Sequence, residues 1–518
     1  MFKIKKSVAA VAAVLAGSPL IAAAVTGPSS STAPYLVPVA SGWNVTSVLT
    51  TGDTIGGYTM GGIPDGLGAF DNGNGTFTVL MNHEWGDTAG AAHGPLTKGA
   101  YVSEWIVNKS NLQVISGKNL ISNVYGWDTA LQKSTATSIA TAFNRFCSAD
   151  LPSLSGLSYT DANTGITYGT TEHLFLNGEE GGANGRAVAT VVTGADAGNA
   201  YVLGKFNPTT NGSGITAVGG WENILINPVS QLKTVAIGNN DGGTGVLSNA
   251  LEMYIGTKTT TGSEVDKAGL TNGITKFINV AGNVNEIVNT TTRATNITDG
   301  TDFTLSDTAS THFSRPEDGT WSADGSKFFF VTTDQIDNTE ITGSTQQVGR
   351  SRLWELVFTD ANNPELGGKI YNLLNGTEGQ NMFDNISLSA DGKDMILLED
   401  TGNAAHNAKV WDYNFATGSL TQVAKHDAAL FGDVVAGSVV VGSVTADEES
   451  SGVIDLSAIL GYKSYMLVTQ NHKSSSNPLL VEGGQLQIIT APVPVPSAIW
   501  LFGSAVAGFL GLKRRNKA

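Results

Sequence analysis

The chain contains a single cysteine, Cys147, among its 518 residues. One cysteine cannot form an intramolecular disulfide, so no internal disulfide stabilises the fold. Three interpretations of Cys147 remain: a small buried thiol, which is the commoner fate of a free cysteine, a nucleophile, or a metal ligand. The residues that the fold brings to Cys147 decide between them.

Basic residues are also scarce. The sequence has 29 Lys and Arg residues against 45 Asp and Glu, which gives a formal charge of −16, and no basic run lies outside the termini. Nucleic-acid binding is therefore not expected. An acidic exported chain can instead use its carboxylates to hold hard cations such as calcium.

Several common signatures are missing. No Gly-x-Gly-x-x-Gly lies between a strand and a helix, and neither His-Glu-x-x-His, Gly-x-Ser-x-Gly nor EF-hand spacing is present. Rossmann, zinc-hydrolase and serine-hydrolase chemistry are accordingly disfavoured. No helical period runs through the middle of the chain, whereas the 63 glycines and many Thr and Asn residues are typical of β-structure with frequent turns.

The N-terminus carries a targeting signal. It begins Met-Phe-Lys-Ile-Lys-Lys, continues with an Ala/Val/Leu run and ends in small residues at Ala22 to Ala24. This order predicts a secretory signal peptide over residues 1–24. Paired arginines are absent before the apolar run, which favours general secretion over the twin-arginine route.

The C-terminus carries a second signal over residues 491–518. Alternating prolines precede the apolar residues 498–512, and Lys513-Arg514-Arg515 follows. An ordinary C-terminal helix is the alternative, but the basic cluster favours a membrane-retained sorting tail. The tail resembles the PEP-CTERM sorting signal, which implies a membrane-bound sorting protease as a partner. We expect an exported protein, periplasmic, cell-surface or extracellular, with a transient membrane anchor through residues 498–512.

Residues 25–490 contain a repeat of apolar strands that end in polar or acidic residues. Two of the strands follow the same turn, Ser-Ala-Asp-Gly, at residues 322–325 and 389–392. Ordinary turn-forming residues would explain the polar end of any single strand, but not six strands that all end in polar or acidic residues. The repeat predicts an all-β six-bladed β-propeller with loops inserted over the channel mouth, where the ends of the inner strands would meet. The six strands are 77–81, 174–176, 234–237, 328–331, 395–398 and 465–468.

Two acidic motifs would need a cation or a hydrogen-bonding partner if they are buried. Glu179 and Glu180 are adjacent carboxylates, and holding both ionised in a buried site requires a cation. On a solvated strand end the same pair would need none. Glu222 lies between Trp221 and an apolar run, where a buried acid needs a hydrogen-bonding partner or a metal.

A third motif is Arg315-Pro316-Glu317. Proline fixes the backbone between the arginine and the glutamate, and a guanidinium is well shaped to bind phosphate. The alternative is an ion pair in a surface turn. Further oxygen-rich candidates for calcium are Asn82-His83-Glu84, Phe383-Asp384-Asn385 and Glu399-Asp400, whereas Asp447-Glu448-Glu449 is by default a solvated acidic loop with a metal role as the lesser alternative.

Taken in order, these motifs resemble the PhoX family of bacterial alkaline phosphatases and its DUF839 relatives, over roughly residues 55 to 455. The most specific parts are Arg-Pro-Glu and the lone cysteine ahead of Glu-Glu. The resemblance implies a six-bladed propeller that hydrolyses phosphomonoesters with calcium and iron. The resemblance implies that the iron ligands are Cys147, Glu222 and Glu317, and that the calcium ligands are Glu84, Glu179, Glu180 and Asp384. Arg315 would bind the substrate phosphate. The candidate catalytic residues are Arg315 and Cys147.

This chain departs from the family in places. Leu-Asn-Gly precedes Glu179 where the family has Thr/Ser-Cys, and Trp-Glu-Asn replaces a longer family segment around Glu222. The leading hypothesis is a monomeric secreted phosphomonoesterase. The alternatives are a non-catalytic, calcium-stabilised propeller of the matrix or cell surface, and a phytase-like or lactonase-like hydrolase that uses calcium alone.

Overall fold

The computed structural model describes residues 22–492 except 181–184, 216–218, 290, 335–349, 403–406, 436–437 and 447. The sorting tail from residue 493 and the signal peptide up to residue 21 lie outside the described residues. The last residues of the predicted signal peptide belong to β1 (Ala23–Thr26), which pairs in parallel with β3 (Asn44–Thr50). No helix of the described part is long and apolar enough to cross a membrane.

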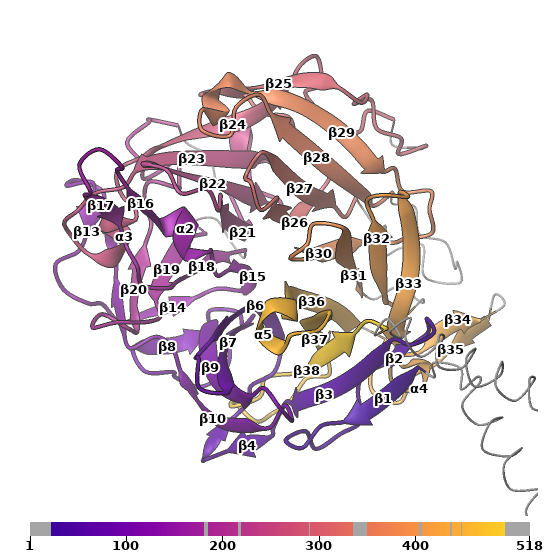
Figure 1. Ribbon diagram of the computed structural model, residues 1–518. Helices are drawn as coiled ribbons and strands as arrows, with labels where there is room; N and C mark the ends of the chain where they lie inside the picture. Colours follow the sequence, from indigo (N-terminus) through magenta and orange to yellow (C-terminus); the bar gives the residue numbers. More distant parts are fainter. Residues whose placement is uncertain are drawn as a thin grey trace, which may run out of the picture.

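The described chain forms antiparallel sheets arranged as a ring (Figure 1). The ring consists of six four-stranded units, each with one strand at the centre, and each central strand contacts the next until the last contacts the first. The prediction of an all-β fold is confirmed. From the centre outwards the units are β6 (Pro64–Asp71), β7 (Thr76–His83), β9 (Tyr101–Asn108), β10 (Val114–Asn119); β15 (Phe146–Asp150), β18 (Leu174–Glu179), β19 (Ala187–Val191), β20 (Asn199–Val202); β21 (Trp221–Ile226), β22 (Lys233–Asn240), β23 (Leu251–Thr257), β24 (Ile274–Val280); β26 (Pro316–Trp321), β27 (Lys327–Thr332), β28 (Arg352–Phe358), β29 (Gly368–Leu374); β30 (Phe383–Leu388), β31 (Asp394–Gly402), β32 (Lys409–Asn414), β33 (Ser419–His426); and β36 (Glu448–Asp455), β37 (Ser464–Asn471), β38 (Gly483–Thr490), β3.

Further short elements lie at the outside of the ring or in its loops. Strand β25 joins the outer edges of β24 and β29, while β2 pairs with β33 and β11 pairs with β20. These elements are β2 (Leu36–Pro38), β4 (Thr54–Ile55), β5 (Tyr58–Thr59), β8 (Leu96–Gly99), β11 (Asn123–Tyr125), β12 (Trp127–Asp128), β13 (Lys133–Ser134), β14 (Thr141–Phe143), β16 (Ser158–Thr160), β17 (Thr167–Gly169), β25 (Thr301–Ser306), β34 (Asp433–Val435), β35 (Ser438–Val440), α2 (Leu154–Leu157), η1 (Gly245–Leu247), α3 (Glu264–Lys267), η3 (Pro364–Leu366), α4 (Ala428–Phe431) and α5 (Ser457–Leu460).

The two ends of the sheet region close the ring. Strand β3, near the N-terminus, pairs antiparallel with β38, near the C-terminus, and completes the unit of β36, β37 and β38. Figure 1 shows the indigo and yellow strands side by side. Closure places every unit between two neighbours, so that no unit at the end of the array leaves a sheet face uncovered.

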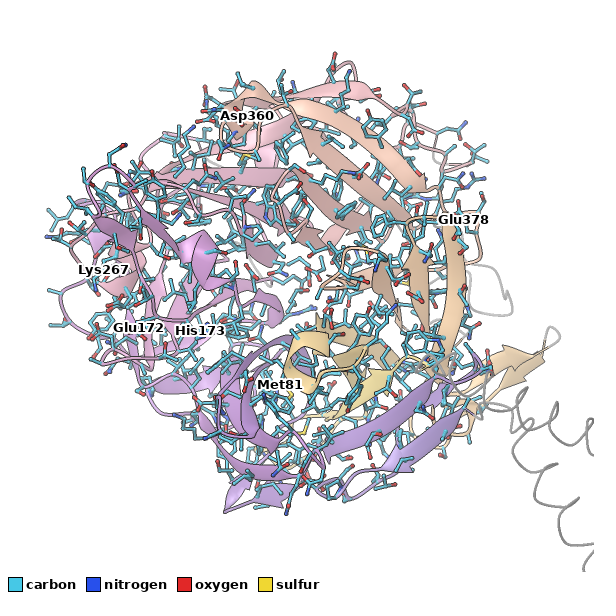
Figure 2. The ribbon with its side chains drawn as sticks, viewed as in Figure 1. Met81, Glu172, His173, Lys267, Asp360 and Glu378 are labelled. Carbon is cyan, nitrogen blue, oxygen red and sulfur yellow. The ribbon has the colours of Figure 1, made fainter. Side chains whose placement is uncertain are left out.

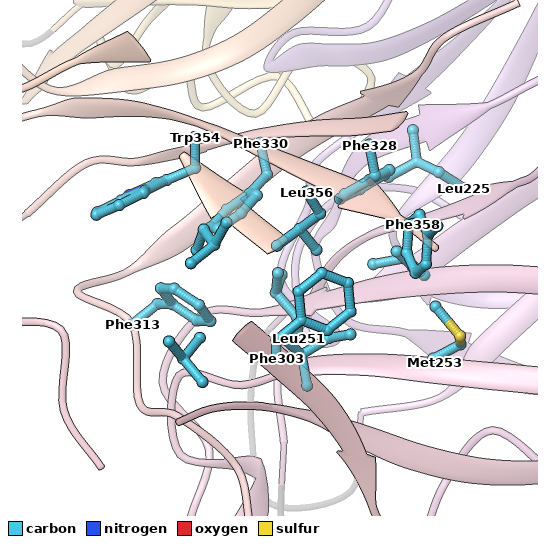
Figure 3. Close-up of a cluster of buried hydrophobic side chains, with 14 of the residues drawn as sticks. Leu225, Leu251, Met253, Phe303, Phe313, Phe328, Phe330, Trp354, Leu356 and Phe358 are labelled. Carbon is cyan, nitrogen blue, oxygen red and sulfur yellow. The ribbon is translucent and has the colours of Figure 1, made fainter. Parts of the chain in front are cut away.

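Apolar clusters fill the spaces between neighbouring units. The cluster in Figure 3 joins Leu251 and Met253 of β23 to Phe328 and Phe330 of β27 and Trp354 of β28. Comparable clusters join the other neighbouring pairs of units around the ring. In Figure 2, Met81 of β7 lies next to the unit of β37 and β38, whereas the charged residues Lys267, Asp360 and Glu378 lie at the periphery.

The six repeat strands found in the sequence are real, but their place in the units differs from the expectation. They are β7, β18, β22, β27, β31 and β37, the second strand of each unit and not the central one. The central strands carry no long apolar run because they pack closely against one another. A Cβ on Gly66 of β6, for example, would lie 2.5 Å from the backbone nitrogen of Ala149 on β15.

We predict that Phe328→Ala destabilises the ring by about 3–5 kcal/mol, the usual cost of truncating a buried phenylalanine. Phe328 is fully buried and packs edge-on against Trp321 at a centroid distance of 5.1 Å. Denaturant unfolding followed by fluorescence measures the loss. Leu366→Ala is the control, because Leu366 is 62% exposed and its truncation should change stability by no more than about 0.5 kcal/mol. Equal effects of the two substitutions would contradict the packing described.

Candidate metal centre

The candidate site lies where the six central strands begin. The second residue of every central strand is an acid or the cysteine, and because the central strands form a closed ring these residues gather around its axis. Five of them are buried, and Glu449 is partly buried. The ring residues are Asp65, Cys147, Glu222, Glu317, Asp384 and Glu449.

A repeated backbone feature aims these side chains inward. In five units the ladder between the first and second strands shifts register at the ring residue. Such bulges bend a strand and redirect a side chain, and they are frequent next to active sites. Only β36 differs, since its register shift lies between Ser451 and Ile454.

Four units share a second feature, a left-handed residue two positions before the ring residue. These are Ile63 (φ 47°), Arg145 (φ 51°), Arg315 (φ 58°) and Met382 (φ 42°). Each carbonyl accepts a hydrogen bond from the second strand of its unit or from the residue that directly follows it. The donors are the N–H groups of Glu84 (2.9 Å), Glu180 (3.0 Å) and Thr333 (3.0 Å), which follow their strands, and of Asp400 (2.9 Å), which lies near the end of β31. A positive φ in a non-glycine residue is costly and persists only where the surroundings fix it, as these bonds do.

The ligand atoms form two groups. Asp65, Glu84 and Cys147 each offer one atom within 4.8 Å of the others. Glu222, Glu317 and Asp384 form a second such group. The expected iron-ligand set of Cys147, Glu222 and Glu317 is thus divided between the groups. Ser148 connects them: its Oγ donates to Oε1 of Glu222 at 2.5 Å, on the strand that carries Cys147.

Neutral amides fix the acids around the first group. Nε2 of Gln470 lies 3.3 Å from Oδ2 of Asp65, 3.0 Å from Oε2 of Glu84 and 3.2 Å from Oε1 of Glu449. One amide cannot neutralise three carboxylates. It orients them but adds no positive charge, which for Glu84 comes from Arg145.

Two arginines contact the acids that directly follow second strands. These acids are called the rim: Glu84, Glu180 and Asp241. Nη2 of Arg315 lies 3.0 Å from Oδ2 of Asp241 and 2.9 Å from Oε1 of Glu317, and its side chain is 36% exposed. Nη2 of Arg145 lies 2.5 Å from Oε1 of Glu84 and 2.7 Å from Oε2 of Glu180. Arg315 was expected at the site, whereas sequence analysis did not identify Arg145.

The structure separates the two members of the Glu-Glu pair. Oε2 of Glu180 faces the ring, 3.6 Å from Sγ of Cys147. Glu179 instead binds Arg186, whose Nε contacts its Oε2 at 2.5 Å and whose Nη2 contacts its Oε1 at 2.6 Å. Both oxygens of Glu179 are therefore engaged away from the two groups.

Sequence analysis also missed Asp65 and treated Glu449 as part of a solvated loop by default. A signal for both was present. Each central strand begins with a residue that is apolar, proline or glutamate, then the ring residue, then a small or polar residue, as in Pro-Asp-Gly at 64–66 and Phe-Asp-Asn at 383–385. This pattern covers only three residues, and it becomes visible only when the first residues of the six central strands are compared.

Burial governs the electrostatics of the site. It raises the pKa of the ring acids and of the Cys147 thiol above their ordinary values, and the charges of neighbouring carboxylates raise them further. For Glu449, burial and the charge of Asp400 raise the pKa to about 8. Burial also acts on Glu84, but Arg145 and Gln470 outweigh it, so that the pKa of Glu84 is lowered.

The donor set fits divalent or trivalent cations. Carboxylate oxygens suit calcium, a thiolate suits a transition metal, and buried like charges are held ionised together only by a cation. The two arginines do not supply enough positive charge for the acids that they face. The chemistry of the donors therefore makes this the candidate metal centre within the described part of the chain.

A comparison with solved structures supports the fold. No protein-family profile matches this chain, and no curated protein matches it in sequence. The structure is similar to that of Pseudomonas fluorescens PhoX in complex with vanadate, a transition-state analogue, with a TM-score of 0.58 and 10% identity over 88% of this chain and 97% of that one. This chain has a PhoX-like fold. A protein of unknown function from Dyadobacter fermentans, with a TM-score of 0.38 and 7% identity over 86% of this chain and 99% of that one, is too different to support an argument.

We predict that the cation-free protein loses stability as the pH rises from about 5 to 8. The ordinary pKa of Glu449 is 4.5 and its folded value is about 8, so between them the folded state binds the proton that the unfolded state releases. Unfolding midpoints measured in chelator across this range should fall, and excess calcium should reduce the fall. Glu449→Gln should reduce the fall without abolishing it, because the pKa values of the other ring acids are raised too. A chelated protein that is as stable at pH 8 as at pH 5 would contradict the assignment.

Proposed function

We propose that the protein is an exported, metal-dependent phosphomonoesterase built on a six-bladed β-propeller. The observation that carries the proposal is the pair of buried ligand groups at the ring axis, with the partly exposed guanidinium of Arg315 beside the second group. The similarity in fold to PhoX, which was solved with a transition-state analogue bound, supports it. The proposal includes secretion, a sorting protease that acts on the tail, and a monomeric mature chain.

The cations would lie in the two groups. Glu222, Glu317 and Asp384 would hold one, and Asp65 and Cys147 of the first group would hold another, with Glu449 close to them through Gln470. Glu84, the third member of the first group, is bound to Arg145 and is not counted as a ligand. Glu179 is not included, because both of its oxygens bind Arg186. Calcium and iron are the proposed metals, and when bound they would supply the positive charge that a phosphoryl group requires in the transition state.

Arg315 would bind the substrate phosphate. Its backbone is fixed by Pro316 on one side and by the N–H of Thr333, which donates to its carbonyl at 3.0 Å. Asp241 and Glu317 orient its guanidinium, and the exposed part of the side chain leaves donors for phosphate oxygens. Because Glu317 is also a proposed metal ligand, the phosphate-binding arginine and the cation are held in one fixed relation.

Hydrogen bonds along the central strands keep the ligands in place. Asn82 donates to the carbonyl of Cys147 at 2.7 Å, and Asn177 donates to Asn82 at 2.6 Å. Thr333 donates to Oε1 of Glu317 at 3.0 Å, so the carboxylate is oriented by a neutral group as well as by Arg315. Rigid ligand positions reduce the rearrangement needed for binding and catalysis.

We predict that the mature protein, supplied with calcium and iron, hydrolyses p-nitrophenyl phosphate. Arg315→Ala should lower kcat/KM by roughly 10²-fold, the usual cost of losing one charge-stabilising donor, and Arg315→Lys should lower it less. Arg186→Lys is the control, because Arg186 pairs with Glu179 outside the ligand groups and its replacement should leave kcat/KM within about twofold of the wild type.

Two measurements separate the alternatives. Activity no higher than that of a Cys147→Ala, Glu317→Ala double variant would refute the phosphatase proposal. Elemental analysis of protein purified without chelator then identifies the remaining hypothesis: calcium without iron and without hydrolysis indicates a calcium-stabilised binding protein. Hydrolysis with calcium alone, unaffected by Cys147→Ala, indicates a calcium-dependent hydrolase.

A further inference from the structure

Arg145 and Arg315 occupy equivalent positions in two different units. Each lies two residues before a ring residue, has a positive φ, and accepts a backbone hydrogen bond through its carbonyl from the chain that leaves the second strand. The other two units with this feature have Ile63 and Met382 there. An arginine is therefore not needed to form the backbone feature, and its presence requires another explanation.

The contacts of Arg145 differ from those of Arg315. Its Nε donates to Oε1 of Glu84 at 2.7 Å and its Nη2 contacts the same oxygen at 2.5 Å and Oε2 of Glu180 at 2.7 Å. Glu84 and Glu180 immediately follow the second strands of adjacent units. The guanidinium thus joins the acids that follow β7 and β18.

The backbone of Arg145 holds the guanidinium at this point. Its N–H donates to the carbonyl of Trp85 at 3.0 Å, and its carbonyl accepts from the N–H of Glu180 at 3.0 Å. The first bond connects it to the residue next to Glu84, and the second connects it to Glu180 itself. A side chain fixed in this way loses little further entropy when it forms its ion pairs.

We propose that Arg145 is a built-in cation that takes the place of a divalent ion between Glu84 and Glu180. A guanidinium stays charged at every pH that the protein can tolerate, whereas a divalent ion must be acquired from outside. Glu84 and Glu180 are then structural partners of Arg145 and not calcium ligands. The inference rests on the proposed function only in that the remaining acids of the ring are taken to bind metal.

Calcium titration of the chelator-treated mature protein tests this directly. We expect Arg145→Met, which keeps an unbranched apolar stem and removes the charge, to bind one more calcium per chain than the wild type. Adding Glu84→Gln to Arg145→Met should remove the extra site. Arg145→Lys, which keeps the positive charge, should bind the same number as the wild type, and circular dichroism checks that each variant is folded.

A second comparison applies if Arg145→Met does not fold. With Arg145 present, Glu180→Gln should leave the number of bound calcium ions unchanged, and a loss of one ion would overturn the inference. Equal stoichiometry in wild type and folded Arg145→Met would overturn it as well, while leaving the phosphatase proposal intact. A wild type that binds no divalent ion, together with an Arg145→Met variant that binds one, would refute the metal-dependent function and support the role of Arg145.

Discussion

The mutual repulsion of buried carboxylates at the ring axis is the constraint on which the rest of the structure depends. Closing six units into a ring brings the starts of six central strands together, and five of those strands present an acid there. The apolar clusters between units provide the favourable energy that holds these charges in close proximity. The same burial raises their pKa values, so protons and a bound cation compete for these carboxylates.

The fold class could be predicted because the second strands are long and apolar and end alike. Phe328–Val331 and Met395–Leu398 are buried between neighbouring strands and neighbouring units, which requires an unbroken apolar run. The central strands could not be found in the same way. These strands approach the next unit closely: a Cβ on Gly66 would lie 2.5 Å from the backbone nitrogen of Ala149, and one on Gly452 would lie 2.5 Å from the carbonyl oxygen of Asp65. Their starts therefore show only a short, mostly polar pattern.

Part of the candidate site could be predicted, namely those residues that lie in distinctive local motifs. Cys147, Glu222, Glu317 and Asp384 lie in distinctive local motifs, and the fold places all four at the axis. Asp65 lies in Pro-Asp-Gly, which resembles an ordinary turn, and Glu449 lies in a run of acids that resembles a solvated loop. The partners of Glu179 and Glu180 depend on which arginine each carboxylate faces across the sheet, and adjacency in the sequence contains no information about that.

The two arginines give the ring its asymmetry. Their backbones are equivalent, but both acids beside Arg145 follow second strands, namely Glu84 of the first ligand group and Glu180. Arg315 instead contacts Glu317, a central-strand residue of the second ligand group, and Asp241. A guanidinium that bridges two acids has its positive charge balanced within the protein. A guanidinium can also pair with a carboxylate that is a proposed metal ligand. Its ion pair would weaken when the cation binds, because the cation attracts the same carboxylate. Metal binding at Glu317, as proposed, would therefore strengthen the ability of Arg315 to attract an external anion.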